Sequence, residues 1–187
     1  MSHFPSLPEI DLISLWKKYN PGVRPLLDVH DEILRGPSEL SEGERELIAA
    51  YVSSLNGCHF CFTAHRDHAL AWHIDPGVFG DVVVDTEHDS LSVKFRALLP
   101  YVRKLTIEPG AVAMEDVEPI YAAGYSEAGL YDIITTTALY AFMNRILEGA
   151  GIKEHVKTLH MSDEQRRKLR YANLRHGIFD KDDPRRM

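Results

Sequence analysis

The chain has 187 residues, of which 44% are hydrophobic and 26% are charged, and its formal net charge is −7. This length and hydrophobic content fit one globular domain with a sizeable core. The acidic balance argues against wide, non-specific nucleic-acid binding, which needs clustered lysine and arginine.

No part of the sequence is predicted to enter a membrane. The longest apolar stretch, residues 133–147, is interrupted by threonine, asparagine and arginine and is shorter than the ~20 apolar residues that a transmembrane helix needs. The first residues lack the basic start and the apolar run of a secretory signal. With only 2 cysteines, the sequence predicts a cytoplasmic protein without a disulfide scaffold.

In chain order, almost every segment between turn signals is predicted to be helical. Apolar residues recur three and four positions apart, which is the pattern of a helix with one buried face. The only strongly β-branched run, residues 82–84, is too short to establish a sheet. The predicted helices cover about residues 9–18, 24–35, 42–55, 58–73, 89–104, 115–123, 127–148 and 162–176.

Short polar motifs mark where several of these helices begin and end. Ser41 with Glu44 forms a capping-box pattern, and Ser162 with Gln165 forms another. Asn56-Gly57 is typical of a helix C-terminus. These signals agree with the apolar periodicity on either side of them.

The whole pattern predicts an all-α fold, a helical bundle, because no sheet signal competes with the helices. We expect residues 1–187 to form a single domain. Its N-terminal part, about residues 1–37, is predicted to be a helical extension, and about residues 177–187 a polar tail.

A C-x-x-C pair at the start of the fourth predicted helix has the clearest chemistry. Cys58 follows Asn56-Gly57 and so lies at or beside a helix N-terminus, where the helix dipole and free N–H groups stabilise a thiolate. Cys61 is one turn further, within disulfide reach of a first-turn cysteine. His65 follows on the same face, where an imidazole can take a thiol proton.

Glu46 is the candidate partner of His65. The break at residues 56–57 is short enough for the two flanking helices to form a hairpin. Glu46 would then return over the second helix and orient or recharge His65. Spacing alone does not fix the register between two helices, so this contact depends on how the hairpin packs.

These residue types can reduce a hydroperoxide. A thiolate attacks the O–O bond and becomes a sulfenic acid, and the second thiol condenses with it to a disulfide. An external dithiol then reduces the disulfide. We cast Cys61, one turn from His65, as the attacking thiol and Cys58 as the more exposed resolving thiol, although the helix dipole favours the opposite casting.

Other roles fit the same cysteines. They can be buried structural residues, or they can bind zinc together with His65. A fourth ligand from His68 is disfavoured, because Cys61 and His68 are separated by roughly 10 Å along a helix axis. His68, Tyr51 and Phe62 are instead candidates for lining a pocket around the thiols.

The segment that carries these residues is similar to a known family. The pattern Glu46-x11-Cys58-x2-Cys61-x3-His65 resembles the active-site motif of alkylhydroperoxidase D-like proteins in the carboxymuconolactone decarboxylase superfamily. Residues 41–58, and the later Leu-Tyr-Ala-Phe-Met-Asn-Arg-Ile-Leu-Glu-Gly that contains Asn144, resemble its peroxidase-related subgroup. The resemblance covers most of residues 24–160.

The resemblance implies an all-helical fold and obligate homo-oligomers whose helices pack across subunits. It also implies a redox pair of Cys58 and Cys61, a proton relay of Glu46 and His65, and a lipoyl-type dithiol that recharges the disulfide. We expect no cofactor and no metal, and an external dithiol reductant of a lipoyl or thioredoxin type. One departure matters. Family members carry a histidine directly before the second cysteine, where this chain has Phe60, so a relay through that histidine and the identity of the reductant stay open.

We therefore predict an alkylhydroperoxidase-like oxidoreductase that reduces small hydroperoxides through Cys58 and Cys61. Two alternatives remain. In the first, the cysteine pair holds zinc or merely packs in the core. In the second, a decarboxylase-type enzyme on the same scaffold uses Glu46 and His65 as acid and base.

Overall fold

The computed structural model describes residues 2–153 and 161–186, and nearly all regular structure in them is helical. In these described residues the only strand-like pairing is an isolated antiparallel bridge between Phe79 and Val84. The α-helices are α1 (Leu12–Lys18), α2 (Val23–Arg35), α3 (Glu42–Leu55), α4 (His59–Ala71), α5 (Val93–Arg96), α6 (Leu99–Ile107), α7 (Met114–Ala122), α8 (Glu127–Ala150), α9 (Asp163–Lys168) and α10 (Arg175–Ile178). Short 3-10 helices are η1 (Pro76–Val78), η2 (Pro109–Ala111), η3 (Tyr171–Leu174) and η4 (Pro184–Arg186).

Across the part of the chain that the structure describes, no helix is both long enough and apolar enough to span a membrane.

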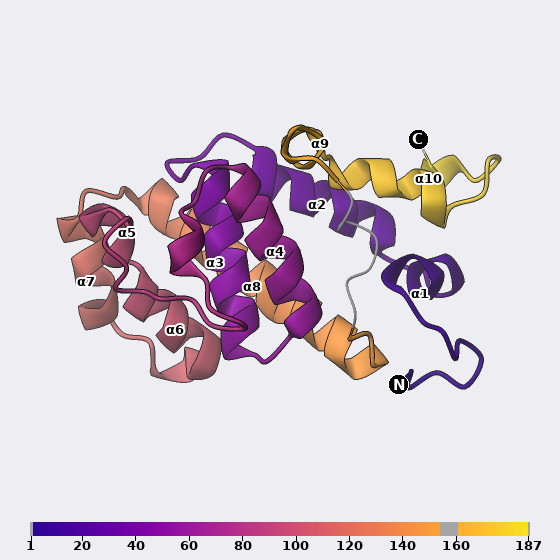
Figure 1. Cartoon of the computed structure of the whole chain (residues 1–187), viewed down its shortest axis with the longest axis horizontal. Coiled ribbons are helices and arrows are strands. Elements are labelled where there is room, and N and C mark those ends of the chain that lie inside the picture. Colours follow the sequence, from indigo (N-terminus) through magenta and orange to yellow (C-terminus); the bar gives the residue numbers. More distant parts are fainter. Residues whose placement is uncertain (1, 154–160, 187) are drawn as a thin grey trace.

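Helices α3, α4 and α8 form the centre of the fold. Figure 1 shows α3 and α4 side by side over the long α8, with α5, α6 and α7 on one flank and α1, α2, α9 and α10 on the other. The α3–α4 pair has the most extensive packing of any two elements, and the α3–α8 pair comes next. Every residue from Arg45 to Ser53 is buried, so neighbours cover α3 on all sides.

Local sequence sets the hairpin between α3 and α4. The predicted capping box is confirmed, because Ser41 Oγ accepts from the Glu44 N–H at 3.3 Å and Glu44 Oε2 accepts from the Ser41 N–H at 2.8 Å. After α3, Gly57 has a φ of +67°, a left-handed conformation that glycine adopts most readily. The Cys58 N–H donates to the Ser53 carbonyl at 2.9 Å, and α4 begins directly after Cys58.

The prediction of one helix over residues 89–104 is wrong, because the chain forms the two helices α5 and α6 there. Pro100 lies in the first turn of α6 and has no N–H to continue a helix from the preceding turn. Ser92 Oγ accepts from the Phe95 N–H at 3.0 Å. This cap starts α5 later than predicted.

The helix predicted over residues 162–176 is also wrong in its length, since α9 ends at Lys168. The backbone N–H groups of Tyr171 and Ala172 donate to the two carboxylate oxygens of Asp31 in α2, at 2.7 and 2.9 Å. This contact holds the chain as η3 instead of a continuing helix. The other predicted helices are confirmed, with their ends shifted by a few residues.

Candidate thiol and proton-relay site

The cysteine pair lies at the start of α4, as the spacing predicts. Cys58 is the N-cap residue of α4 and Cys61 lies in its first turn. Both are free thiols and both are buried, with exposed fractions of 0% and 3%. The expectation that Cys58 is the more exposed thiol is therefore wrong, because its side chain has no exposed surface.

The pKa values of the two thiols are shifted in opposite directions from the ordinary cysteine value. Hydrogen bonding from the Cys61 thiol lowers the pKa of Cys58 to about 7. The same hydrogen bond raises the pKa of Cys61 well above its usual value, and burial raises it further. Near neutral pH the site therefore favours a thiolate at Cys58 and a protonated thiol at Cys61.

Glu46 meets His65 as the hairpin argument anticipated. Glu46 Oε2 is 2.5 Å from Nδ1 of His65, and the Glu46 side chain has no exposed surface. Burial alone raises the pKa of this carboxyl group, but the charge of Arg35 and the hydrogen bond from His65 outweigh it and hold the pKa well below the usual range. Glu46 is therefore a fixed buried carboxylate that accepts hydrogen bonds.

Arg35 is a site residue that the sequence reasoning missed. Its Nη2 donates to Glu46 Oε1, and its side chain is only 2% exposed. The guanidinium also lies 6.0 Å from the Trp72 ring centroid and 5.9 Å from that of Tyr171. The available signal was indirect: a glutamate inside the apolar face of a helix needs a buried cation, but spacing does not tell which one.

Tyr140, on α8, is a second residue that the sequence reasoning missed. Its ring centroid lies 4.2 Å from that of His65 in an edge-on arrangement. Burial chiefly raises the pKa of its hydroxyl, and Cys61 is among the groups that raise it further. Tyr140 is thus a close neighbour of the imidazole. In the described residues no hydrogen bond joins His65 directly to either thiol.

Asn144 is a third such residue, one turn after Tyr140 on α8. It stands in the segment whose sequence resembles the peroxidase-related subgroup, but nothing in its spacing predicted a role. It is 1% exposed. Its Nδ2 donates to Ser53 Oγ at 3.0 Å, and its Oδ1 accepts from Asn56 Nδ2 at 2.9 Å.

The predicted pocket residues lie in different surroundings. His68 is buried beside the site, with its ring centroid 6.3 Å from that of His65. The structure places the other two away from it. Tyr51 interacts with Arg103 of α6, and Phe62 packs edge-on against Phe79 at 6.4 Å.

Within the described ranges, no three or more His, Cys, Asp or Glu side chains are grouped so that they could hold a metal ion. The rival zinc site at Cys58, Cys61 and His65 therefore has no preformed ligand set there.

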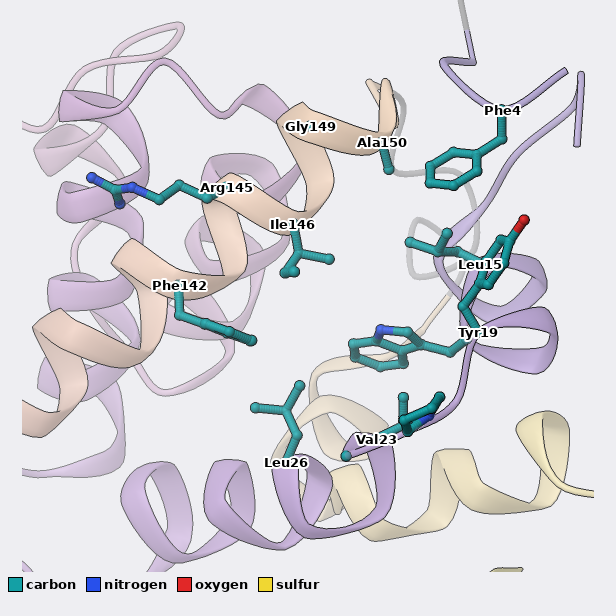
Figure 2. Close-up of a pocket in the computed structure, with 13 residues that line it drawn as sticks. Phe4, Leu15, Tyr19, Val23, Leu26, Phe142, Arg145, Ile146, Gly149 and Ala150 are labelled. Atoms are coloured by element: carbon teal, nitrogen blue, oxygen red, sulfur yellow. The ribbon is translucent and has the colours of Figure 1, made fainter.

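An apolar pocket of about 530 Å³ lies between the N-terminal segment, α1, the start of α2 and the last turns of α8. Figure 2 shows Leu26, Phe142 and Ile146 pointing into it. None of the four predicted catalytic residues lines this pocket. The cysteine pair and the relay lie instead among α3, α4 and α8.

Fold and site together define a class: an all-helical protein with a buried cysteine pair at a helix start and a Glu–His–Arg cluster one to two turns away. Residues 23–103 match the carboxymuconolactone decarboxylase family. This segment is therefore similar to that family, and the fold is similar to that of a solved alkylhydroperoxidase AhpD core.

Three solved structures share the fold. An alkylhydroperoxidase AhpD core, an uncharacterized peroxidase-related protein from Ralstonia eutropha JMP134, has a TM-score of 0.70 and 25% identity over 79% of this chain and 77% of its own. An uncharacterized peroxidase-related protein from Silicibacter sp. TM1040 has a TM-score of 0.66 and 22% identity over 83% and 94%.

The third structure, from Agrobacterium tumefaciens, is a protein of unknown function proposed to be an antioxidant defence protein AhpD. Its TM-score is 0.67, at 20% identity over 84% of this chain and 100% of its own. No curated protein matches this chain.

Proposed function

We propose that this protein is a thiol-dependent peroxidase that reduces small hydroperoxides by oxidising Cys58 and Cys61 to a disulfide. One observation carries the proposal: two buried free thiols at the start of α4, with the pKa of one lowered and that of the other raised. A thiolate beside a protonated thiol suits attack followed by resolution. The peroxidase-related names of structures with this fold support it.

In this reaction Cys58 is the attacking residue, the reverse of the casting expected from the position of His65. Its thiolate attacks one peroxide oxygen, so that an S–O bond forms while the O–O bond breaks, and the leaving alkoxide takes up a proton to become an alcohol. The Cys61 thiol then attacks the sulfenic sulfur, the S–S bond forms and water leaves. The two electrons that the thiols lose reduce the peroxide, and an external dithiol restores both thiols.

The proton for the alkoxide is the one that the Cys58 thiol gave up, and His65 carries it. Because the Glu46 carboxylate accepts from Nδ1–H of His65, Nε2 is left as the acceptor nitrogen. The ring of Tyr140 packs edge-on against His65 and helps to hold the imidazole in place. Arg35 keeps Glu46 charged throughout.

The surroundings of the thiols restrict the partners. Both sulfurs are buried, so the proposed substrate is a small hydroperoxide, and the reductant is a lipoyl-type or thioredoxin-like dithiol that the oxidised pair must open to meet. A thiol pair that needs continuous reduction suits the reducing cytoplasm, where we expect the protein to act.

We also propose that the protein is a homo-oligomer. Helix α8 leaves two large apolar side chains exposed, Tyr131 by 65% and Phe142 by 49%. Large exposed apolar side chains on one helix suit packing against a second subunit. Size-exclusion chromatography with light scattering tests this, and a strictly monomeric species at micromolar concentration would contradict it.

The test of the function is turnover. Reduced protein should consume hydrogen peroxide or a small alkyl hydroperoxide in the presence of dithiothreitol, and C58S, C61S and the double variant should each lose this activity. C58S removes the attacking thiol, whereas C61S isolates it, and a sulfenic acid trapped at Cys58 in C61S supports the casting. Peroxide consumption at the level of buffer alone in the wild-type protein would sink the proposal.

The name of the matched family favours a second candidate, an acid–base decarboxylase that uses Glu46 and His65. The double cysteine variant separates the two. Full turnover of a carboxylated lactone by that variant supports the second candidate, because no thiol is left to react.

A further inference from the structure

Helix α8 places one buried amide beside the α3–α4 turn that carries Cys58. Asn144 lies on the buried face of α8, with 1% of its surface exposed. It faces the end of α3, where the Cys58 N–H donates to the Ser53 carbonyl at 2.9 Å. The same Ser53 therefore contacts both Cys58, through its backbone, and Asn144, through its hydroxyl.

The orientation of this amide is fixed. The hydroxyl hydrogen of Ser53 goes to the Ala49 carbonyl at 2.7 Å, so Ser53 Oγ can only accept from Asn144 Nδ2, at 3.0 Å. On the other side, Asn144 Oδ1 accepts from Asn56 at 2.9 Å. The nitrogen of Asn144 thus faces Ser53 and its oxygen faces Asn56, so the amide is held between two residues that flank Cys58 in the chain.

One hydrogen of this amide remains for the sulfurs. An Asn NH₂ group carries two hydrogens, and Ser53 takes one of them. Asn144 acts as a hydrogen-bonding neighbour of both Cys58 and Cys61 and lowers the pKa of each thiol. A buried donor aimed at a sulfur favours its charged form, because the interior offers no water to do so.

We propose that Asn144 is a further catalytic residue whose side-chain N–H binds the Cys58 sulfur and stabilises its thiolate. The role in turnover rests on the proposed peroxidase function, whereas the effect on the thiol does not. Among the residues that the structure describes, the other titratable or charged groups that act on Cys58 are the Cys61 thiol and the Lys153 ammonium. Lys153 also pairs with Glu148.

The experiment is a pH titration of the Cys58 thiolate, followed by ultraviolet absorbance and by the rate of alkylation with iodoacetamide. Asn144→Leu keeps the approximate volume and removes the N–H. Asn173→Leu, at an exposed position in η3, is the matched control, and Lys153→Met measures the effect of charge alone. Circular dichroism confirms that each variant is folded.

We expect the titration midpoint of Cys58 to rise above its wild-type value of about 7 in Asn144→Leu, so that the thiolate fraction at neutral pH falls by about twofold while the effect of Cys61 remains. Asn173→Leu should keep the wild-type midpoint. If Asn144→Leu does not fold, Asn144→Asp replaces it, because it has the same shape and no N–H, and it should raise the midpoint as well.

An unchanged midpoint in a folded Asn144 variant overturns the inference, even if the wild-type protein consumes peroxide. Conversely, a raised midpoint together with no peroxide consumption by the wild-type protein supports this inference while the proposed function fails. The two proposals can therefore be contradicted separately.

Discussion

Glu46 is the residue on which the relay depends. Its carboxylate lies in the interior between the Arg35 guanidinium and the His65 imidazole. A buried charge is tolerated only when opposite charge and hydrogen bonds surround it. Because both carboxylate oxygens are occupied, Glu46 orients His65 and fixes its tautomer, and it is the imidazole that moves protons.

The ion pair gives a residue-scale prediction. Arg35→Met keeps much of the side-chain volume but leaves Glu46 without its cation, so the free energy of unfolding should fall by about 3 kcal/mol. Urea unfolding measures it. The control is Arg170→Met, at an exposed position, which should cost little. Equal unfolding free energies for the two variants would show that Arg35 is not needed to hold Glu46.

At the scale of elements, the turn between α3 and α4 places both cysteines. Gly57, in its left-handed conformation, ends α3, and α4 begins directly after Cys58. A Cβ atom at Gly57 would meet no other atom within 4 Å. Any cost of a side chain there is therefore conformational and not steric.

A pair of glycine variants tests this turn. Gly57→Ala should lower the free energy of unfolding by about 1 kcal/mol, because alanine disfavours a positive φ. Gly149→Ala, inside α8 and also without a close neighbour, should raise it by a few tenths to about 1 kcal/mol, because alanine is the better helix former. Thermal or urea unfolding distinguishes them, and a shift of the same sign in both would rule out the conformational explanation.

A helix end can be predicted from the sequence when the contact that sets it comes from residues nearby in the chain. The capping box at Ser41 and the turn at Gly57 are local, so α3 and the start of α4 could be predicted. The break at Pro100 is also local, and the apolar periodicity concealed it. The end of α9 was beyond reach, because Asp31 of α2 decides it.

The candidate site divides in the same way. Cys58, Cys61 and His65 share one helix, so their spacing along the chain predicts their proximity. Arg35, Tyr140 and Asn144 come from α2 and α8, and only the packing register between helices brings them to the site. The register between packed helices cannot be deduced from the spacing of residues along the chain.

At the scale of the whole molecule, the C-terminal segment is part of the core. Ile178 and Phe179, in the region expected to be a polar tail, are only 2% and 4% exposed, and α10 packs on α1. The same segment brings Tyr171 against His30, with ring centroids 4.9 Å apart. This cover keeps the imidazoles around the relay out of water.

Two buried histidines connect stability to pH. Burial lowers the pKa of His30 and of His68 from 6.5 to about 4. Between these values the unfolded chain binds more protons than the folded one, so the stabilisation is complete above pH 6.5 and is lost as the pH falls toward 4. Each pKa shift corresponds to at most about 3 kcal/mol in the free energy of unfolding.

We therefore expect the free energy of unfolding to decrease as the pH is lowered from 6.5 to 4, and we expect His30→Gln to weaken this dependence. Urea unfolding at a series of pH values measures the slope. His59→Gln, at an exposed position, serves as the control and should keep the wild-type slope. Parallel pH profiles for wild type and His30→Gln would contradict the assignment.

The central claim is that hydroperoxide converts the buried Cys58–Cys61 pair to a disulfide within one chain. Peptide mass mapping after the reduced protein meets an equimolar amount of hydrogen peroxide measures this directly. The account predicts that the peptide spanning both cysteines loses two hydrogen atoms and that dithiothreitol restores them. Two thiols that stay free, or oxygen added to one cysteine without any disulfide, would contradict it.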